Sequence, residues 1–276
     1  MPSEKPSLST AQRAAVYLRN SQLDKCAAFA ANGGTLDAHL TLVQYSLQFI
    51  SSSMQKVELA KLSRVYLNLL QSSGVSINTV MKLAGKVLSV QQTLDAANRI
   101  GSLAELVSDV RIFNRLWGLL PLLQWYVSVI ENPPTDKVIR YVRYLQVAAN
   151  ILYQPLENVA YLASHNVIPM SESAQLRLWC ESCKLWAAHV VLEFVRLYRE
   201  YVLYKESKRS EVSEKTSSRL YYDVPSRDWV LSMFMNAAYL PLTVHWSLPQ
   251  GCLSPMQVGF FGTVAGISQV YPLWFK

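Results

Sequence analysis

The sequence is short of the residues that build disulfide frameworks, disordered linkers and charged surfaces. Its 276 residues include four cysteines, ten glycines and twelve prolines. The cysteines are too few and too scattered for a disulfide framework, and so little Gly and Pro is not typical of extended disorder. Only 16% of the residues are charged, whereas soluble proteins average about 25%. Period-2 alternation is scarce, and apolar residues recur mainly at helical spacing, which predicts an all-α fold.

The longest gap in charge lies at the end of the sequence, where no Asp, Glu, Lys or Arg occurs from Trp229 to Phe275. Two apolar segments, Trp229–Leu248 and Pro255–Phe275, each have about the 20 residues that a bilayer requires. Pro249–Gly251 is expected to form the turn between them. We therefore expect lipid to surround this tail, as one or two C-terminal transmembrane helices.

Small residues recur along the second apolar segment. Gly259, Gly262 and Gly266 lie at spacings of three and four, and the last two form a GxxxG pair. Small residues at this spacing let two membrane helices approach closely. These glycines are the predicted packing site of the tail.

The sequence also lacks the fingerprints of enzymes and metal sites. Its four histidines are dispersed, and no HExxH, GxSxG, P-loop or dinucleotide-binding motif occurs. Cys180 and Cys183 form a CxxC, but it lies inside a strongly helical stretch and has no second ligand pair nearby. We interpret these cysteines as packed helix residues, and we expect no catalysis, no cofactor and no metal.

Targeting signals at the ends are missing too. The first ten residues are polar and neither form an apolar signal segment nor resemble an Arg-rich presequence. The final tripeptide is neither a peroxisomal-matrix nor an ER-retention signal. We therefore expect synthesis in the cytosol and membrane insertion through internal signals.

Positive charge is concentrated in the first half of the chain. The formal net charge is +7, and Lys56 to Arg115 holds eight basic against four acidic residues. Such charge suits an anionic membrane surface or nucleic acid, but Trp and Tyr near the ends of the apolar runs favour the membrane. The apolar faces of these basic helices either pack as a bundle core or lie among lipid headgroups.

Breaks divide the predicted helices and define three regions. Residues 1–204 are expected to be a bundle of amphipathic helices, 205–228 a charged loop, and 229–276 the membrane anchor. The expected breaks are Gly33-Gly34, Gly74, Gly101-Ser102, Asn132–Pro134 and Pro169. The longest periodic helix follows Ser171.

Four stretches occur in a characteristic order. They are HLTLVQYSLQF (39–49), VSDVRIFNRLWGLLPLL (107–123), ANILYQPLENVAYLASHNVI (149–168) with the helix after it, and GFFGTVAGISQVYPLW (259–274). Gln44 and Tyr45 match a Q-Y motif, and Arg111 and Arg115 match two spaced arginines. Together the stretches resemble the peroxin-eleven family of peroxisomal membrane proteins, in a fungal-type form, and they cover most of the chain.

The resemblance implies a protein of the peroxisomal membrane that elongates and constricts this membrane before fission. An amphipathic helix would insert into the cytosolic leaflet and favour curvature. The best candidate is Val107–Leu120, with Arg111 and Arg115 on anionic headgroups. Its membrane-binding residues would be Val107, Val110, Arg111, Phe113, Arg115, Trp117 and Leu120. Implied partners are membrane lipids, further copies of the chain, the fission machinery and the import receptor for peroxisomal membrane proteins, but no nucleic acid.

Two other functions stay open at this point. The apolar segments could form a pore or carrier for small metabolites, although polar residues suited to a carrier are sparse there. Alternatively, the chain is a helical adaptor whose uncharged tail is its own core.

Overall fold

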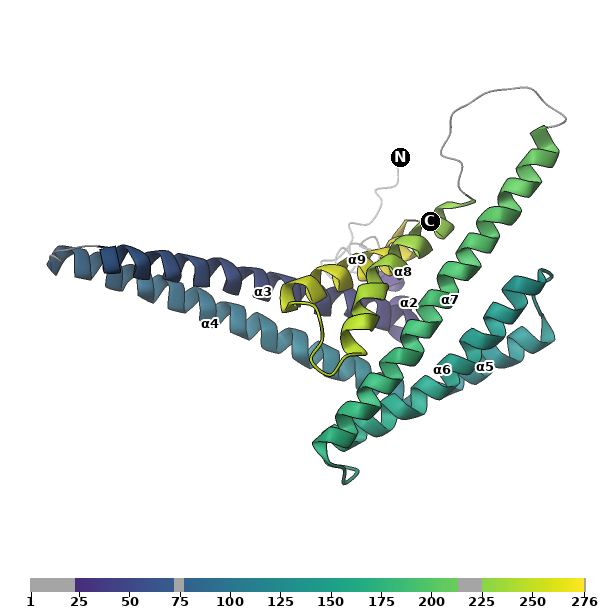
Figure 1. Cartoon of the computed structure of the whole chain (residues 1–276), viewed down its shortest axis with the longest axis horizontal. Helices are drawn as coiled ribbons and strands as arrows, with labels where there is room; N and C mark the ends of the chain where they lie inside the picture. Colours follow the sequence, from purple (N-terminus) through teal and green to yellow (C-terminus); the bar gives the residue numbers. More distant parts are fainter. Residues whose placement is uncertain (1–22, 72–76, 213–224, 276) are drawn as a thin grey trace, which may run out of the picture.

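The computed structural model describes residues 23–71, 77–212 and 225–275, and every regular element in these ranges is helical (Figure 1). The expected all-α fold is therefore confirmed for this part of the chain. In chain order the elements are α2 (Leu23–Ala31), α3 (Gly33–Gln71), α4 (Ile77–Asn114), the 3₁₀ turn η1 (Arg115–Trp117), α5 (Leu119–Glu131), α6 (Lys137–Ser164), α7 (Glu172–Val212), α8 (Arg227–Trp246) and α9 (Pro255–Trp274).

The helices are arranged as two antiparallel hairpins joined at a central junction (Figure 1). Helices α3 and α4 lie side by side and form a long arm, while α5 and α6 form a shorter hairpin on the other side of the junction. Helix α7 packs along α6 and contacts α8. Helix α9 packs against both α8 and α3, so the two ends of the described chain meet at the junction.

The arm contains two helices that are longer than the sequence predicts. Helix α4 continues through Gly101 and Ser102, where a break was expected. A Cβ atom on Gly101 would lie 3.1 Å from the Ser51 hydroxyl oxygen, and this hydroxyl donates to the Ala97 carbonyl at 2.7 Å. Gly101 therefore allows α3 to approach α4 and does not end the helix. Gly74 lies outside the described residues.

Other predicted boundaries are confirmed. The chain leaves its helix at Asn132–Pro134, and the Asp136 carboxylate then accepts from the Ile139 amide at 3.0 Å to cap α6. Helix α7 begins directly after Ser171, as expected, but it continues to Val212. The charged loop predicted for 205–228 is therefore shorter at its start, and its residues 213–224 lie outside the described ranges.

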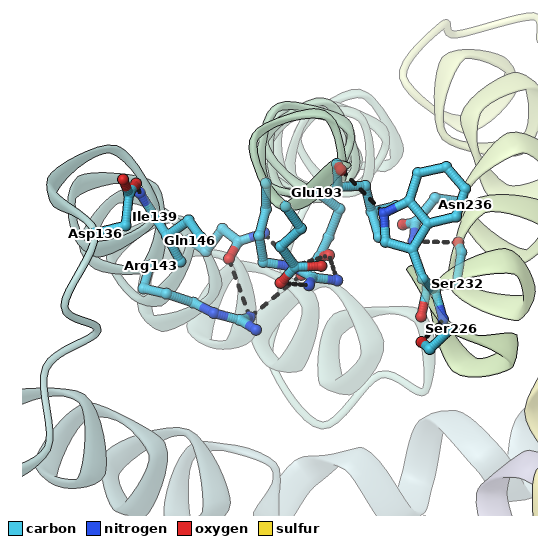
Figure 2. Close-up of polar contacts among 12 residues, drawn as sticks. Asp136, Ile139, Arg143, Gln146, Glu193, Ser226, Ser232 and Asn236 are labelled. Atoms are coloured by element: carbon cyan, nitrogen blue, oxygen red, sulfur yellow. Dashed lines mark hydrogen bonds and ion pairs between the residues drawn. The ribbon is translucent and has the colours of Figure 1, made fainter. Parts of the chain in front are cut away.

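The interface between α6 and α7 contains a buried polar cluster. Figure 2 shows Arg143, Gln146 and Glu193 pointing toward one another between these helices. Glu193 accepts from Gln146 at 2.9 Å and from Arg143 at 3.3 Å, and its other oxygen accepts from Arg196 at 2.7 Å. Buried charge is stable only when it is paired and hydrogen-bonded in this way. The cluster fixes how α6 and α7 face each other.

The uncharged tail contributes to the core instead of standing apart from it. Tyr45 of α3, Leu242 of α8 and Val258 of α9 are buried together. The Trp274 indole nitrogen also donates to Nε2 of His39 at 2.8 Å, which ties the end of α9 to the start of α3. The tail therefore packs on the rest of the chain, which the expectation of a separate membrane anchor did not include.

Among the described residues, no helix combines the length and the apolar character needed to cross a membrane. The prediction of one or two C-terminal transmembrane helices is therefore not supported. Both α8 and α9 have 20 residues, but polar side chains interrupt them. Asn236 and His245 lie in α8, and Gln257, Ser268 and Gln269 lie in α9.

Candidate functional site

An exposed apolar stripe runs along the end of α4, through η1 and into α5. We call it the α4–α5 stripe, and its residues are Leu103, Leu106, Val110, Phe113, Trp117 and Leu120. Their spacing of three and four places them on one side of the helical path, and each is between 42% and 67% exposed. Exposing an aligned row of apolar side chains to water is unfavourable. Such surfaces usually contact a membrane or another protein.

The backbone stays helical through the stripe, although α4 ends before α5 begins. Asn114 and Gly118, which flank η1, both keep right-handed helical backbone angles. Pro121 has no amide hydrogen for the Trp117 carbonyl, which explains why regular α-helical bonding fails here. A Cβ atom on Gly118 would lie 2.5 Å from Oε1 of Gln154, so a larger residue here would displace the Gln154 amide.

Side chains of α6 satisfy the backbone groups that the break leaves open. The Gln154 amide donates to the Arg115 carbonyl at 2.8 Å, and the Asn158 amide donates to the Leu116 carbonyl at 3.1 Å. Buried carbonyls need such partners. These hydrogen bonds therefore stabilise the break and fix the start of α5 on α6.

The two arginines of the predicted membrane helix point to the interior. Arg111 is 7% exposed; its Nε donates to Asp37 at 2.9 Å, and its Nη1 donates to Gln44 at 2.5 Å. Arg115 forms an ion pair with Glu157, with 3.1 Å between Nη2 and Oε1. Contact of Arg111 with lipid headgroups, as predicted, is contradicted by this burial, and Arg115 is largely used inside the fold.

Both arginines keep their charge in this setting. Burial by itself lowers the pKa of Arg115, but nearby Tyr153 and Glu157 outweigh burial and raise it. For Arg111, burial is likewise outweighed by the hydrogen bond and charge of Asp37, and its pKa is raised. The ion pairs therefore hold α4 and η1 against α3 and α6.

The predicted membrane-binding residues thus divide into two groups. Val110, Phe113, Trp117 and Leu120 point outward, and Val107 is half-buried. Arg111 and Arg115 lie on the opposite side, because a helix places residues at these spacings on different faces. The row of apolar residues was visible in the sequence, but the inward direction of the arginines was not, since Asp37 and Glu157 lie far away along the chain.

A second apolar surface lies on α5 and α6 and was not among the predicted site residues. Its exposed members are Leu123, Tyr126, Val127, Ile130, Val138, Tyr141, Leu145 and Leu152. The two helices leave an open apolar groove of about 440 Å³ between them. Residues 116–130 contain no charged side chain, and this is the signal in the sequence for the α5 part of the surface.

The predicted packing glycines lie where α9 contacts α3. A Cβ atom on Gly259 would lie 2.5 Å from the Phe49 amide nitrogen, and one on Gly266 would lie 2.7 Å from the Leu42 Cα. A Cβ atom on Gly262 would overlap the Tyr45 ring. The helix they approach belongs to the same chain, and their role in packing membrane helices stays a prediction.

Comparison with known proteins gives the family. Residues 79–274 match the family described as Peroxisomal biogenesis factor 11 (PEX11). The chain is 32% identical to Peroxisomal membrane protein 11C of Homo sapiens, over 59% of this chain and 68% of that protein. It is 26% identical to an uncharacterized protein of Schizosaccharomyces pombe, over 70% of this chain and 86% of that protein. No solved structure matches the chain.

The family match covers more than half of the chain and includes the α4–α5 stripe, the α5–α6 hairpin and α9. The family is one of peroxisome biogenesis factors and not a known enzyme family. The fungal type that was expected from the sequence stays a prediction. The chain therefore belongs to the peroxisomal biogenesis factor 11 family and is a peroxisomal membrane protein of peroxisome proliferation.

Proposed function

We propose that the chain elongates and constricts the peroxisomal membrane by inserting the α4–α5 stripe into the cytosolic leaflet. A helix that is buried part of the way into one leaflet expands that leaflet and favours curvature. The observation that carries the proposal is the row of exposed apolar side chains from Leu103 to Leu120 on one side of the chain. Family membership supplies the membrane on which this face would act.

Apolar burial is expected to dominate the binding energy. Full burial of a Leu, Val or Phe side chain contributes about 1.5–3 kcal/mol, and half-exposed residues gain roughly half of that. Six such residues together contribute about 4.5–9 kcal/mol, which is comparable to one myristoyl chain and corresponds to reversible binding. Since Arg111 and Arg115 are used inside the fold, the exposed Arg99, one turn before Leu103, is better placed for an anionic headgroup.

A tubulation assay with the full chain tests the proposal. Phe113→Glu or Trp117→Glu places a charge in the inserted face, and we expect either change to abolish tubulation of vesicles that contain anionic lipid. Burying an unpaired carboxylate in a leaflet costs several kcal/mol, while the outward position of both residues leaves the fold unchanged. Electron microscopy of the vesicles measures tubulation, and co-sedimentation measures binding.

Matched controls separate insertion from general loss of surface apolarity. Trp117→Phe keeps the apolar face and should tubulate like the wild type. Tyr198→Glu changes an aromatic residue of α7 that is 68% exposed, close to the 67% of Trp117, and it should keep most of the activity. Tubulation that survives both stripe substitutions would contradict the proposal.

Self-association and recruitment of the fission machinery and of the import receptor belong to the same hypothesis and stay predictions. So does the alternative of a pore or carrier for small metabolites. Conductance of the purified full chain in planar bilayers separates that alternative from remodelling. A remodelling protein should bend vesicles without conducting.

A further inference from the structure

A cavity of about 740 Å³ lies at the central junction, between α3, α4, η1, α6, α7, α8 and the turn that joins α8 to α9. Its size falls within the range of small-molecule sites, which is about 300–1,000 Å³. It is open at one side, where Leu176 of α7 and Leu248 after α8 are 44% and 46% exposed. The α4–α5 stripe points away from it, so the cavity is separate from the proposed membrane face.

The cavity has an apolar wall and a charged floor. Trp179, Trp186 and Trp246 line the wall, and the rings of the last two are stacked at 5.6 Å between centroids. The charged residues that line it are Arg111, Arg115, Asp37 and Glu157. A cavity of this composition suits a hydrocarbon chain along the wall and a polar head on the floor.

The floor carries no surplus charge for an ionic head. Arg111 is paired with Asp37, and Arg115 is paired with Glu157, so the four formal charges cancel. A carboxylate or phosphate would be attracted by each guanidinium and repelled by the adjacent carboxylate. Burial of a net charge is unfavourable unless a partner is available. An uncharged head therefore fits better than an anion.

Two unpaired atoms in the residues of the floor indicate the chemistry of that head. Among the described residues, the buried side-chain atoms without a hydrogen-bond partner are Arg115 Nε and Glu157 Oε2. The first is a donor and the second is an acceptor. They belong to one ion pair, whose single close contact joins Arg115 Nη2 to Glu157 Oε1 at 3.1 Å. A hydroxyl group both accepts and donates, so it suits a floor that offers one unpaired donor and one unpaired acceptor. Both atoms are covered by their neighbours, so the two side chains turn slightly toward the cavity when such a group binds.

From these observations we infer that the cavity is a binding site for a single-chain lipid whose head is uncharged and carries hydroxyl groups, such as a monoacylglycerol. The hydroxyl accepts from Arg115 and donates to Glu157. The acyl chain lies along the tryptophans and leaves toward Leu176 and Leu248. This inference does not depend on membrane remodelling by the α4–α5 stripe.

A competition experiment with the full chain tests the site. The purified protein is incubated with equal amounts of monoolein, oleate and lysophosphatidylcholine and is then released from detergent in native mass spectrometry. Each of these lipids has a single long acyl chain, so they differ mainly in the head. We expect the monoolein adduct to exceed each of the other two at least tenfold. Oleate adducts that equal or exceed those of monoolein would overturn the inference.

Glu157→Gln tests the role of the floor directly. This change gives the floor one net positive charge, so the ratio of monoolein to oleate adducts should fall at least tenfold. Glu181→Gln is the matched control, because Glu181 is an exposed residue of α7 paired with Lys184 at 2.7 Å, and it should leave the ratio unchanged. An unchanged ratio in folded Glu157→Gln contradicts the inference.

Filling the cavity distinguishes it from the outer apolar surfaces. Ser108 lines the cavity, and Ser108→Trp should remove the monoolein adduct while the stripe stays intact. An adduct that persists would show lipid on the outer surface and would overturn the assignment. The wild-type competition decides the question by itself if either variant does not fold.

Discussion

The backbone of α9 lies against the backbone of α3 because three of its residues have no side chain. At Gly266 a Cβ atom would meet the Leu42 backbone at 2.7 Å. A backbone atom cannot rotate away as a flexible side chain can. A single methyl group added at this contact therefore forces the two helices apart.

Gly266→Ala is expected to destabilise the fold by about 1–3 kcal/mol, the usual effect of overpacking. The control is Gly85→Ala in α4, where the added Cβ atom meets nothing within 4 Å. That change should be neutral or stabilise by up to about 1 kcal/mol, because alanine favours helix more than glycine does. Denaturant unfolding followed by circular dichroism measures both, and equal effects would contradict the close contact.

His245 is predicted to make stability depend on pH on the acid side. Its Nδ1 accepts from the amides of Cys252 at 2.8 Å and Leu253 at 3.0 Å, and burial lowers its pKa. A proton on Nδ1 would remove both bonds. Since the pKa is lower in the folded state than its unfolded value of about 6.5, this stability is present above pH 6.5 and is lost as the pH falls through the folded pKa.

His245→Asn keeps an acceptor oxygen near the same place but cannot be protonated in this range. The variant should lose less stability than the wild type between pH 7 and pH 5, as measured by thermal unfolding. His165→Asn changes a more exposed histidine and should leave the acid-side loss in place. Parallel pH profiles of His245→Asn and the wild type would speak against this role.

At the scale of elements, the cluster around Glu193 determines how α6 and α7 pack. Glu193→Ala leaves Arg143, Gln146 and Arg196 without their shared acceptor, and the expected loss is about 3–5 kcal/mol. Glu181→Ala removes an exposed carboxylate of the same helix, and we expect a loss below about 1 kcal/mol. Unfolding free energies give both values, and a small loss for Glu193→Ala would show that α6 and α7 pack without the cluster.

The sequence predicted the helices better than it predicted where they end. Asn132–Pro134 and Ser171 were reliable boundaries, because Pro cannot continue a helix and short polar side chains cap one. Gly101 was misread, since its role in letting α3 approach α4 depends on a helix about 50 residues away. Local patterns predict an element, whereas a close approach depends on the tertiary partner.

The candidate site was likewise predicted in part. The apolar side of Val107–Leu120 followed from helical spacing alone. The fate of Arg111 and Arg115 did not, because a basic stripe on an amphipathic helix has the same pattern whether it contacts headgroups or carboxylates from other helices. Asp37 and Glu157 supply those carboxylates, and no short-range signal reveals that pairing.

At the scale of the whole molecule, the tail changes the interpretation most. Its lack of charge predicted a lipid environment, yet α8 and α9 pack on α3 and α7. Many large apolar residues are also exposed before the tail, including both surfaces described on α4, α5 and α6. For a peroxisomal membrane protein, these surfaces are the natural candidates for contact with lipid.

The most direct test of the central claim measures how deeply the α4–α5 stripe enters the membrane. Nitroxide labels are placed at positions 113, 117 and 120, one at a time, in a full chain whose exposed Cys26 and Cys252 are replaced by serine. Paramagnetic relaxation on vesicles then compares exposure to oxygen with exposure to an aqueous nickel complex. The account predicts that all three labels lie about 5–10 Å below the headgroups. A label at position 198 on α7 should stay in water. Stripe labels that the nickel complex reaches as readily as it reaches position 198 would contradict the account.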